Sequence, residues 1–567
     1  MRVFTIATIV ILAVVFRFFQ LGNLPPSPYW EEVALGYDAY SILKTGKDHH
    51  GNWLPVVAFE SFGDWKPGFY IYTVVPSIFI FGLNTFAIRF PSAVAGLAIV
   101  IGSGILANQL FLEKRPSKLP NEKSSHWLPY LVILVAAVEP WGIIFSRAAW
   151  EANLATALVL WSIIFVFKQT HSTNKYIPSY LITAAIGTVL AMYTYHAARI
   201  AAPMMVGAAF LFTELEQLSV WSKLKTRSKR LRFLLVPTLT FLLLLSPLLI
   251  NMTSNTVTNR FTTTSIFSDL DVIIQSNQLK ELSGNSFLSR IVYHRYLLFG
   301  KEIISNFGKH FDLGYLFLHG DTNPRHSVQY FGQLYPLSLV LLIIGLSTLV
   351  YRHRRQAVLF IFWFIFGLFA STLVVGSPHA VRSLVVFPFF AIIIGLGLHR
   401  SIDWLSRISK PKQLIFTSIF SVIFVAQIGV FWLYYSQVYP AVFAQEWQYG
   451  YKEMIATVNQ LAIAYPDEQI YITREQGRPA MYYWFYSQID PTLVQSYELT
   501  SSKDQSEFLQ FGRFHFIDSA DAVSTSYGIL AASPSFTADV GLATEGDVAI
   551  VSNLLGKPIW IIQHYEK

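Results

Sequence analysis

Two carboxylates and a lysine stand in the first polar stretch of the chain, residues 22–69. Glu31 and Glu32 are adjacent and follow a Pro-rich turn, and Lys66 lies where apolar sequence resumes. A carboxylate can take a proton from a hydroxyl, and an ammonium group can hold a phosphate. Together at a membrane surface, these groups would suit a lipid-phosphate substrate. The same residues also fit an ordinary solvated loop whose aromatic side chains anchor it at the interface.

The composition favours a protein that crosses a membrane several times. Of 567 residues, 53% are hydrophobic and 13% are charged. The net charge of +8 is concentrated in short loops, so nucleic acid is not an expected partner. The chain has no cysteine, which excludes disulfides, zinc–thiolate sites and thiol nucleophiles. The first apolar run shows no clear cleavage site, so we expect a retained span rather than a removed signal.

Eleven apolar segments approach the length of about 20 residues that a span requires. They are 4–21, 87–111, 127–145, 152–168, 177–192, 200–215, 233–250, 332–350, 356–375, 383–398 and 413–435. The stretch 69–82 is also apolar, but it has only 14 residues and contains Pro76. We predict a helix that lies in or dips into the interface there; the alternative is a short true span.

The basic residues set the predicted topology. With 69–82 not crossing, one side of the membrane holds the loops at 112–126, 216–232, 351–355 and 399–412. These loops carry Lys114, Arg115, Lys118, Lys123, Lys223, Lys225, Arg227, Lys229, Arg230, Arg232, Arg352, Arg354, Arg355, Arg400, Arg407, Lys410 and Lys412. Basic loops stay in the cytoplasm, so we predict eleven spans, a cytoplasmic N-terminus and an outer C-terminus. The long outer segments are then 22–86, 251–331 and 436–567.

Three short outer turns, at 146–151, 193–199 and 376–382, each carry one arginine: Arg147, Arg199 and Arg382. Basic residues are scarce in short outer loops. These arginines therefore either bind anionic lipid head groups or only snorkel and pair locally.

The tail, residues 436–567, changes character, because apolar stretches of strand length alternate with polar segments. We predict strands at 469–475, 513–518 and 557–565 and helices at 451–465 and 477–488. This pattern indicates a small soluble α/β domain outside the membrane. It shows no phosphate loop, metal-ligand spacing or nucleophile motif, so we expect it to cover a site or to recognise an acceptor.

Several motifs in order along residues 1–400 resemble glycosyltransferase family 39, within the GT-C superfamily. This is the family of protein O-mannosyltransferases and the lipid A aminoarabinose transferase. The matching stretches are Pro25–Glu32 (PPSPYWEE), Gly63–Pro67 (GDWKP), Ala87–Ala95 (AIRFPSAVA), Phe145–Glu151 (FSRAAWE), Tyr193–Arg199 (YTYHAAR), Gly320–Ser327 (GDTNPRHS) and Ser377–Ser383 (SPHAVRS). Each motif is weak alone, and their order and spacing carry the resemblance.

The resemblance implies a polytopic α-helical GT-C fold of about eleven spans, with residues 1–435 as the catalytic module and 436–567 as an extracytoplasmic α/β domain. It also implies transfer of a sugar from a polyprenyl-phosphate donor to a hydroxyl of a protein, lipid or wall glycan on the outer face of a bacterial-type plasma membrane. The transfer would be a single, inverting displacement without cofactor or metal.

The same resemblance assigns the site residues. The family usually has Asp-Glu where this chain has Glu31-Glu32, so Glu31 is the expected base and Glu32 is expected to orient the site. Lys66 matches the phosphate-binding lysine of a common Lys-Pro-Pro motif, whose second proline is Gly68 here. The other expected phosphate ligands are Arg382, Arg147 and Arg325. The expected substrate contacts are Asp64, Tyr195, Arg199, His326 and His379.

Some of these assignments leave alternatives open. Glu151 either positions the acceptor or pairs with Arg147, and Arg17 is a weaker candidate ligand. The histidines are equally compatible with packing roles. Side chains of adjacent residues diverge on most backbones, so we do not expect His49 and His50 to bind a metal.

Two rival functions remain at this stage. A transporter or flippase for the same lipid would explain the basic outer turns, but no repeated halves of the kind that transporters favour are visible. A catalytically inactive scaffold is the second rival, because the longer Glu31 side chain departs from the usual Asp.

The topology can be tested by cysteine labelling, since the native chain has no cysteine. We expect an impermeant maleimide to label Ser487→Cys in intact cells and Ser228→Cys only after the cells are opened. Labelling of Ser228→Cys in intact cells would overturn the predicted orientation.

Overall fold

The computed structural model describes residues 2–112, 125–171, 178–216, 227–251, 264–498, 500–523, 527–541 and 548–566. The predicted cytoplasmic residues Lys114, Arg115, Lys118, Lys123, Lys223 and Lys225 lie outside these ranges. The chain divides into two compact units, which are described separately. Unit 1 comprises Met1–Arg17, Val94–Ser146 and Trp150–Phe431, and unit 2 comprises Phe18–Ala93, Arg147–Ala149 and Trp432–Lys567.

Each of the eleven apolar segments is helical. The helices are α1 (Arg2–Phe18), α4 (Thr85–Phe111), α5 (Leu128–Val138), α6 (Pro140–Ser146), α7 (Glu151–His171), α8 (Ser179–Met192), α9 (Ala198–Glu216), α11 (Arg227–Ile250), α16 (Pro336–Arg352), α17 (Arg354–Thr372), α18 (Phe387–Leu405) and α19 (Lys410–Leu433). Among the described residues, five helical stretches are long and apolar enough to cross a membrane, or six if α5 and α6 form one span. The remaining apolar helices are shorter, so helix length does not confirm eleven spans.

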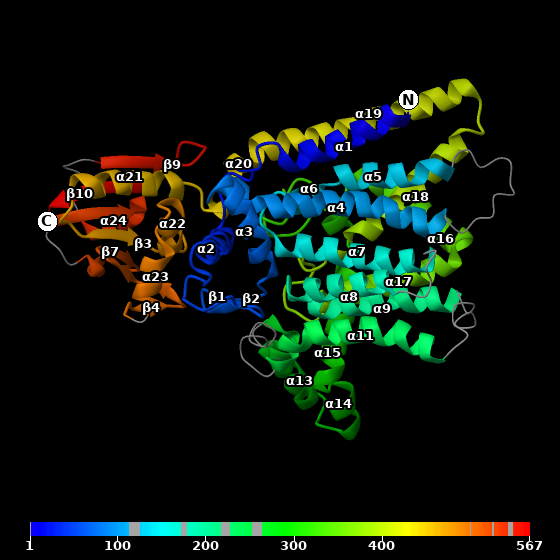
Figure 1. The fold of residues 1–567 in the computed structure, drawn as a ribbon, viewed down its shortest axis with the longest axis horizontal. Coiled ribbons are helices and arrows are strands. Elements are labelled where there is room, and N and C mark those ends of the chain that lie inside the picture. Colours follow the sequence, from blue (N-terminus) through cyan, green and yellow to red (C-terminus); the bar gives the residue numbers. More distant parts are fainter. Residues whose placement is uncertain are drawn as a thin grey trace. The chain divides into compact units, whose positions relative to one another are not determined.

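Most helices of unit 1 run side by side with roughly parallel axes (Figure 1). Helix α18 packs between α16 and α5, while α7 packs on α8 and α9. Glycines allow the closest approach. A Cβ on Gly345 would lie 2.0 Å from the carbonyl oxygen of Ile393, and one on Gly397 would lie 1.9 Å from that of Leu341. Small residues thus bring the α16 and α18 backbones into contact, as is common between membrane helices.

The segment 127–145, predicted as one span, is two helices bent by 60° at Glu139. Pro140 starts α6 and has no N–H to continue the hydrogen bonding of α5. The buried Glu139 carboxylate accepts hydrogen bonds from the Tyr335 amide at 2.8 Å and from the Ser338 hydroxyl. The break is therefore tied to the first turn of α16.

Arg17 satisfies the carbonyl groups that the break leaves at the end of α5. Its Nη1 donates to Ala137 O and its Nη2 to Ala136 O, both at 3.1 Å, and the side chain is fully buried. The last carbonyls of a helix have no intrahelical partner. The structure thus gives Arg17 a helix-capping role rather than the substrate role considered from sequence.

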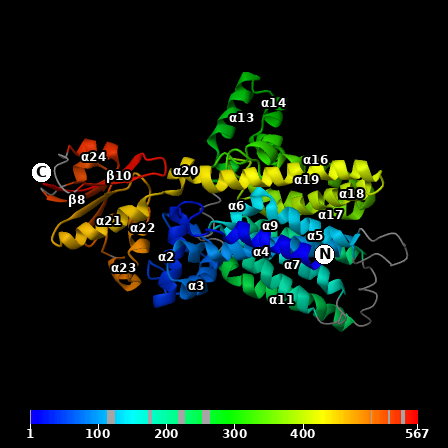
Figure 2. The ribbon, with the colours of Figure 1, turned by 90° about the horizontal axis from the view of Figure 1, so that it is seen from above.

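The predicted outer segment 251–331 contains helices that the sequence analysis did not predict. These are η2 (Ile266–Ser268), α13 (Leu270–Leu282), α14 (Phe287–Val292), α15 (Arg295–Lys309) and the π-helix η3 (Gly314–Leu318). A β-bridge joins Ser265 to Val374, just after α17. Both views show α13 and α14 extending sideways from the helices of unit 1 (Figures 1 and 2).

Unit 2 begins with helix α2 (Trp30–Thr45), a hairpin of β1 (Phe59–Ser61) and β2 (Asp64–Lys66), and helix α3 (Phe69–Phe81). Helix α3 confirms the helix predicted at 69–82. The hairpin turns at Phe62 and Gly63, which both have positive φ angles of 55° and 77°. The chain enters the C-terminal region through η5 (Tyr434–Val438), α20 (Tyr439–Val442) and η6 (Gln445–Trp447).

The C-terminal region forms a six-stranded mixed sheet of order β6-β7-β3-β8-β10-β9, in which β3 is parallel to both neighbours. The strands are β3 (Ile470–Thr473), β6 (Gln510–Phe511), β7 (Phe514–Ile517), β8 (Tyr527–Ala532), β9 (Val548–Ser552) and β10 (Pro558–Glu566). A separate short hairpin pairs β4 (Lys503–Asp504) with β5 (Glu507–Phe508). The helices are α21 (Tyr451–Ala464), α22 (Pro479–Tyr486), α23 (Pro491–Tyr497) and α24 (Pro534–Val540). The three predicted strands and two predicted helices are confirmed.

Within unit 2, the C-terminal region packs on the first polar loop, residues 22–69. Helix α2 contacts α22 and α23. The Tyr37 hydroxyl donates to Ile489 O at 2.9 Å, and the Tyr482 hydroxyl donates to Pro28 O at 2.9 Å. The strand-containing region therefore supports the helix that carries Glu31.

Candidate functional site

The structure brings together the predicted base and the predicted phosphate-binding lysine. Glu31 lies in the first turn of α2, where the helix dipole favours a carboxylate. Lys66 ends β2, and its Nζ forms an ion pair with Glu31 Oε2. The Lys66 side chain is 6% exposed, whereas that of Glu31 is 31% exposed. A substrate could thus reach the carboxylate while the ammonium group stays largely buried.

The hairpin explains why this chain has Gly68 where the resembling motif has a second proline. Phe59 pairs with Lys66 across the two strands. A Cβ on Gly68 would lie 2.3 Å from Cε2 of Phe59, which real side chains do not tolerate. The ring therefore occupies the space where the resemblance places a second proline. Asp64 also serves the hairpin, because its Oδ1 accepts from the Trp65 amide at 2.8 Å.

Glu32 is fully buried and has a different environment from Glu31. Its Oε2 accepts from Arg89 Nε and from the Ala149 amide, both at 2.9 Å. Its Oε1 accepts from Arg89 Nη2 at 3.0 Å and from the Tyr29 amide at 3.4 Å. All four partners are N–H donors, so the carboxylate is saturated. This environment fits the orienting role expected of Glu32 and leaves no oxygen for a substrate.

Arg89 is the residue of this cluster that the sequence analysis missed. Besides Glu32, it donates to Pro25 O at 2.9 Å, Ser27 O at 2.7 Å and Leu21 O at 3.2 Å. The sequence feature that could have identified Arg89 is its position as an arginine inside the apolar motif AIRFPSAVA. A charged residue in such a segment is costly unless it has partners.

Arg147 uses its guanidinium to hold the chain that leads into the Pro-rich turn. Its Nη2 donates to Phe19 O at 2.6 Å and to Leu24 O at 3.1 Å. The guanidinium also lies 5.4 Å from the ring centroid of Trp432 and 5.7 Å from that of Tyr435. These contacts give Arg147 an anchoring role, and its contact with a donor phosphate stays a prediction.

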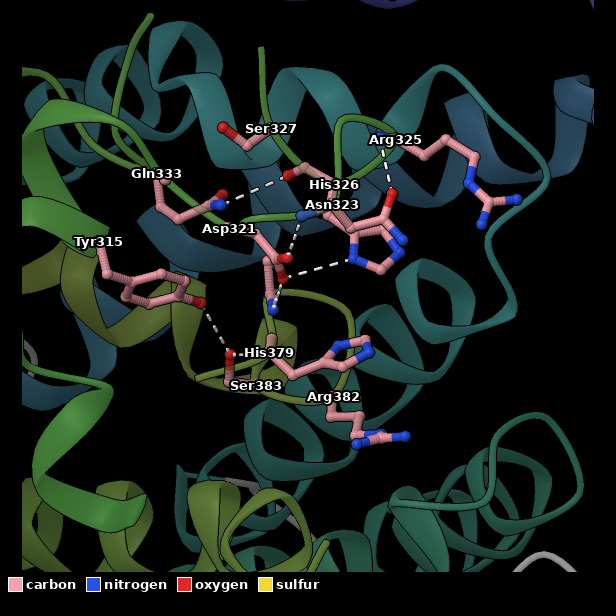
Figure 3. Close-up of polar contacts among 12 residues, drawn as sticks. Tyr315, Asp321, Asn323, Arg325, His326, Ser327, Gln333, His379, Arg382 and Ser383 are labelled. Atoms are coloured by element: carbon pink, nitrogen blue, oxygen red, sulfur yellow. Dashed lines mark hydrogen bonds and ion pairs between the residues drawn. The ribbon is translucent and has the colours of Figure 1, made fainter. Parts of the chain in front are cut away.

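In unit 1, Asp321 joins two loops that carry predicted site residues (Figure 3). Its Oδ2 accepts from the Ala380 amide at 2.7 Å and lies 3.3 Å from His326 Nδ1. Its Oδ1 accepts from the Asn323 amide at 2.9 Å. The rings of His326 and His379 lie 4.9 Å apart. The structure thus unites the two predicted histidines around an aspartate that was part of a quoted motif but received no role.

Burial and neighbouring charges set the ionisation of this cluster. Burial alone would raise the pKa of Asp321, but the hydrogen bond and charge of His326, together with His379 and the Ala380 amide, hold that pKa below its usual range. Burial, with the charges of Arg382 and His326, lowers the pKa of His379 to about 3. At neutral pH the carboxylate is therefore charged and the His379 imidazole is neutral.

Asp321, His326 and His379 also form a donor set that could hold a divalent metal. One possible ligand atom from each lies within 4.8 Å of the others, and zinc accepts such ligands. The Asp321 oxygens already join the two loops by hydrogen bonds, so the protein's own contacts account for the arrangement of the three side chains. The expectation that catalysis needs no metal stays a prediction.

The remaining predicted residues of unit 1 lie around this network or on nearby helices. The guanidinium groups of Arg325 and Arg382 extend away from Asp321 (Figure 3). Arg382 and Tyr195 line a common small pocket, together with Ala152 near the start of α7. Glu151 begins α7 immediately before this lining residue, and Arg199 lies in the first turn of α9. Lys66 belongs to unit 2 and Arg382 to unit 1, so their joint hold on one phosphate stays a prediction.

The expectation that His49 and His50 diverge is wrong. Their ring centroids lie 3.9 Å apart. Each ring nevertheless has its own carboxylate. His49 Nδ1 lies 2.6 Å from Asp38 Oδ1, and His50 Nδ1 lies 3.1 Å from Glu498 Oε1.

Unit 1 consists mainly of apolar helices, and the C-terminal region contains a sheet with flanking helices, as the sequence predicted. The structure is similar to that of ArnT from Cupriavidus metallidurans in the apo state, with a TM-score of 0.54 and 13% identity over 99% of this chain and 97% of that chain. It is also similar to the same protein bound to undecaprenyl phosphate, with a TM-score of 0.51 and 12% identity over 98% and 97% of the two chains.

A third similarity, to the oligosaccharyltransferase of Archaeoglobus fulgidus, has a TM-score of 0.46 and 13% identity, and covers 85% of this chain and 61% of that chain. No family model and no curated protein matches the sequence. At these identities the two comparisons with ArnT establish the fold alone.

The two glutamates are predicted to differ in their effect on stability. In Glu32→Gln the amide nitrogen would face N–H donors, and a buried ion pair would lose its charge; removing one partner of such a pair typically costs about 3–5 kcal/mol. In the matched variant Glu31→Gln, the amide oxygen still accepts from Lys66 and solvent reaches the rest. We expect thermal unfolding of the detergent-purified protein to shift strongly downward only for Glu32→Gln. Equal shifts would show that Glu32 is not the structural member of the pair.

Proposed function

We propose that this chain is an integral-membrane glycosyltransferase that moves a sugar from a polyprenyl-phosphate donor to an acceptor hydroxyl on the outer face of the membrane. The observation that carries the proposal is the ion pair of Glu31 and Lys66 at the start of α2. It combines a reachable carboxylate with a buried ammonium group, which are the two groups this transfer requires. The GT-C fold, which an undecaprenyl phosphate-binding protein shares, supports the proposal.

In the proposed reaction the acceptor oxygen attacks the anomeric carbon as the bond from that carbon to the phosphate oxygen breaks. One displacement inverts the anomeric configuration. The acceptor proton passes to the Glu31 carboxylate. The leaving group is already a phosphate, so it needs no acid, but it does need cations to stabilise its charge. Lys66 is the proposed principal cation, with Arg382, Arg147 and Arg325 as further candidates.

The ion pair suggests how donor binding and base activation are coupled. In the ligand-free chain Lys66 neutralises Glu31, and a carboxylate held by an ammonium group is a weak base. A donor phosphate would compete with the carboxylate for Lys66. When the ammonium group turns to the phosphate, Glu31 loses its counter-ion and becomes available to accept a proton. The base would thus be active only when the donor is in place.

The two rival functions predict different results in one assay. Purified protein in liposomes would be given a radiolabelled polyprenyl-phosphate sugar, and both transbilayer movement and sugar release would be measured. We expect release. Movement without release would indicate a transporter, and neither movement nor release would indicate an inactive scaffold. The identities of the sugar and of the acceptor can then be sought among glycoconjugates lost on deletion.

Lys66→Ala is predicted to weaken donor binding about tenfold or more. A charge-assisted hydrogen bond contributes roughly 1.5–3 kcal/mol, and the same loss is expected for Arg382→Ala. Binding would be measured with a polyprenyl phosphate in detergent. Lys452→Ala, which removes an exposed lysine of α21, is the matched control and should bind normally. Unchanged affinity in both site variants would remove these residues from the donor site.

Glu31→Gln is predicted to lower the rate of transfer by about 10²–10⁴-fold, the usual contribution of a positioned general base, while donor binding survives. Glu31→Asp is the sharper variant, because Asp is the residue of the resembling sequences. A restored or raised rate would show that the longer chain is merely tolerated, and a lowered rate would show that the acceptor pocket has adjusted to Glu. Full transfer by Glu31→Gln would place the base elsewhere, with Glu151 as the next candidate.

A further inference from the structure

Helices α13, α14 and α15 expose an unusual set of large apolar side chains. Leu282 is 85% exposed, Phe287 82%, Ile304 74% and Leu288 68%. Single exposed apolar side chains are normal, but large apolar side chains this exposed on three consecutive helices mark a surface that contacts something apolar. No described residue of the chain covers these positions.

The contacts of the last turn of α15 and of the residues that follow it fix the depth of these helices along the bundle. Asn306 Nδ2 donates to Thr372 O at 3.4 Å, and His310 Nε2 lies 2.9 Å from Ser371 Oγ, at the C-terminal end of α17. The ring of Phe311 lies 6.0 Å from that of Phe364, which is eight residues earlier in α17. Eight residues correspond to roughly 12 Å of helix. The end of α15 therefore overlaps the apolar length of α17 instead of standing beyond it.

The direction of the helices agrees with this depth. Both views show α13 and α14 extending sideways, across the axes of the bundle helices (Figures 1 and 2). A segment that leaves a membrane bundle in this direction, at this level, runs along the plane of the membrane. Its neighbours there would be lipids.

The charges fit the same environment. Residues 270–309 contain five basic side chains, Lys280, Arg290, Arg295, Lys301 and Lys309, and three acids, Asp271, Glu281 and Glu302. Helices that lie in the membrane interface combine an apolar face with lysines and arginines, because the apolar side chains enter the acyl region and the cations meet anionic head groups.

We infer that α13–α15 form an interfacial hairpin embedded in the leaflet at the C-terminal end of α17, the outer leaflet in the predicted topology. The acyl chains of that leaflet cover its apolar side chains. The chain runs from α15 through η3 directly into the loop of Asp321 and His326. A hairpin held in the leaflet thereby sets the depth at which this loop meets a lipid head group.

The inference can be tested by spin labelling, because the cysteine-free chain accepts single labels without background. Leu282→Cys and Leu288→Cys would be labelled and placed in nanodiscs of phosphatidylcholine and phosphatidylglycerol. Collision rates with oxygen, which concentrates in lipid, and with a water-soluble nickel chelate would be measured by EPR. Both positions are exposed, so the variants are expected to fold.

Two further positions calibrate the measurement. Val422→Cys lies on the apolar helix α19, where Val422 is 68% exposed, and Gln510→Cys lies on an exposed site of β6. We expect the hairpin labels to resemble Val422→Cys, with high oxygen and low nickel accessibility. High nickel accessibility, as at Gln510→Cys, would show that the hairpin stands in water. Low accessibility to both reagents would show that a second copy or another protein covers it, and either outcome would overturn the inference.

Discussion

The buried pair of Glu32 and Arg89 holds the first polar loop, residues 22–69, in its folded form. Each carboxylate oxygen accepts two hydrogen bonds, and all five N–H groups of the guanidinium are used. Three of the acceptors are carbonyls of the turn at residues 21–27, so one side chain of α4 fixes both this turn and the start of α2. A buried ion pair contributes little net stability, but its geometry is specific. Here it fixes the point from which the neighbouring Glu31 extends toward solvent.

The two adjacent glutamates have different roles: Glu32 is structural, and Glu31 is the proposed catalytic residue. Glu32 has only N–H partners from the protein and no access to solvent, whereas Glu31 pairs with the Lys66 ammonium group and is partly exposed. In the proposed mechanism a donor phosphate takes the ammonium group from Glu31 and leaves the contacts of Glu32 in place. The proposed catalytic group can therefore change its ionic environment during a reaction while the group that positions it does not.

Polar side chains inside the apolar unit serve its breaks and its outer loops. Glu139 and Arg17 satisfy amides and carbonyls where the helix α5–α6 bends, and Asp321 joins two loops through the Ala380 amide. In each case an ionisable side chain forms hydrogen bonds with backbone groups that have no partner within a regular helix. In a sequence such residues therefore resemble substrate ligands, although some of them have a structural role. Arg17 is one example.

The sequence by itself determined the helical segments, the strand-containing tail and the presence of two acids and a lysine in the first polar stretch. These follow from local properties, namely apolar runs, alternation and residue type. The tertiary structure alone decided which glutamate is buried and which histidines meet. The partners of Glu32 are 57 and 117 residues away in the chain, at Arg89 and Ala149, and no local pattern distinguishes it from Glu31. Successive residues of a helix point in different directions, and only the packing around α2 determines which direction faces an arginine and which faces water.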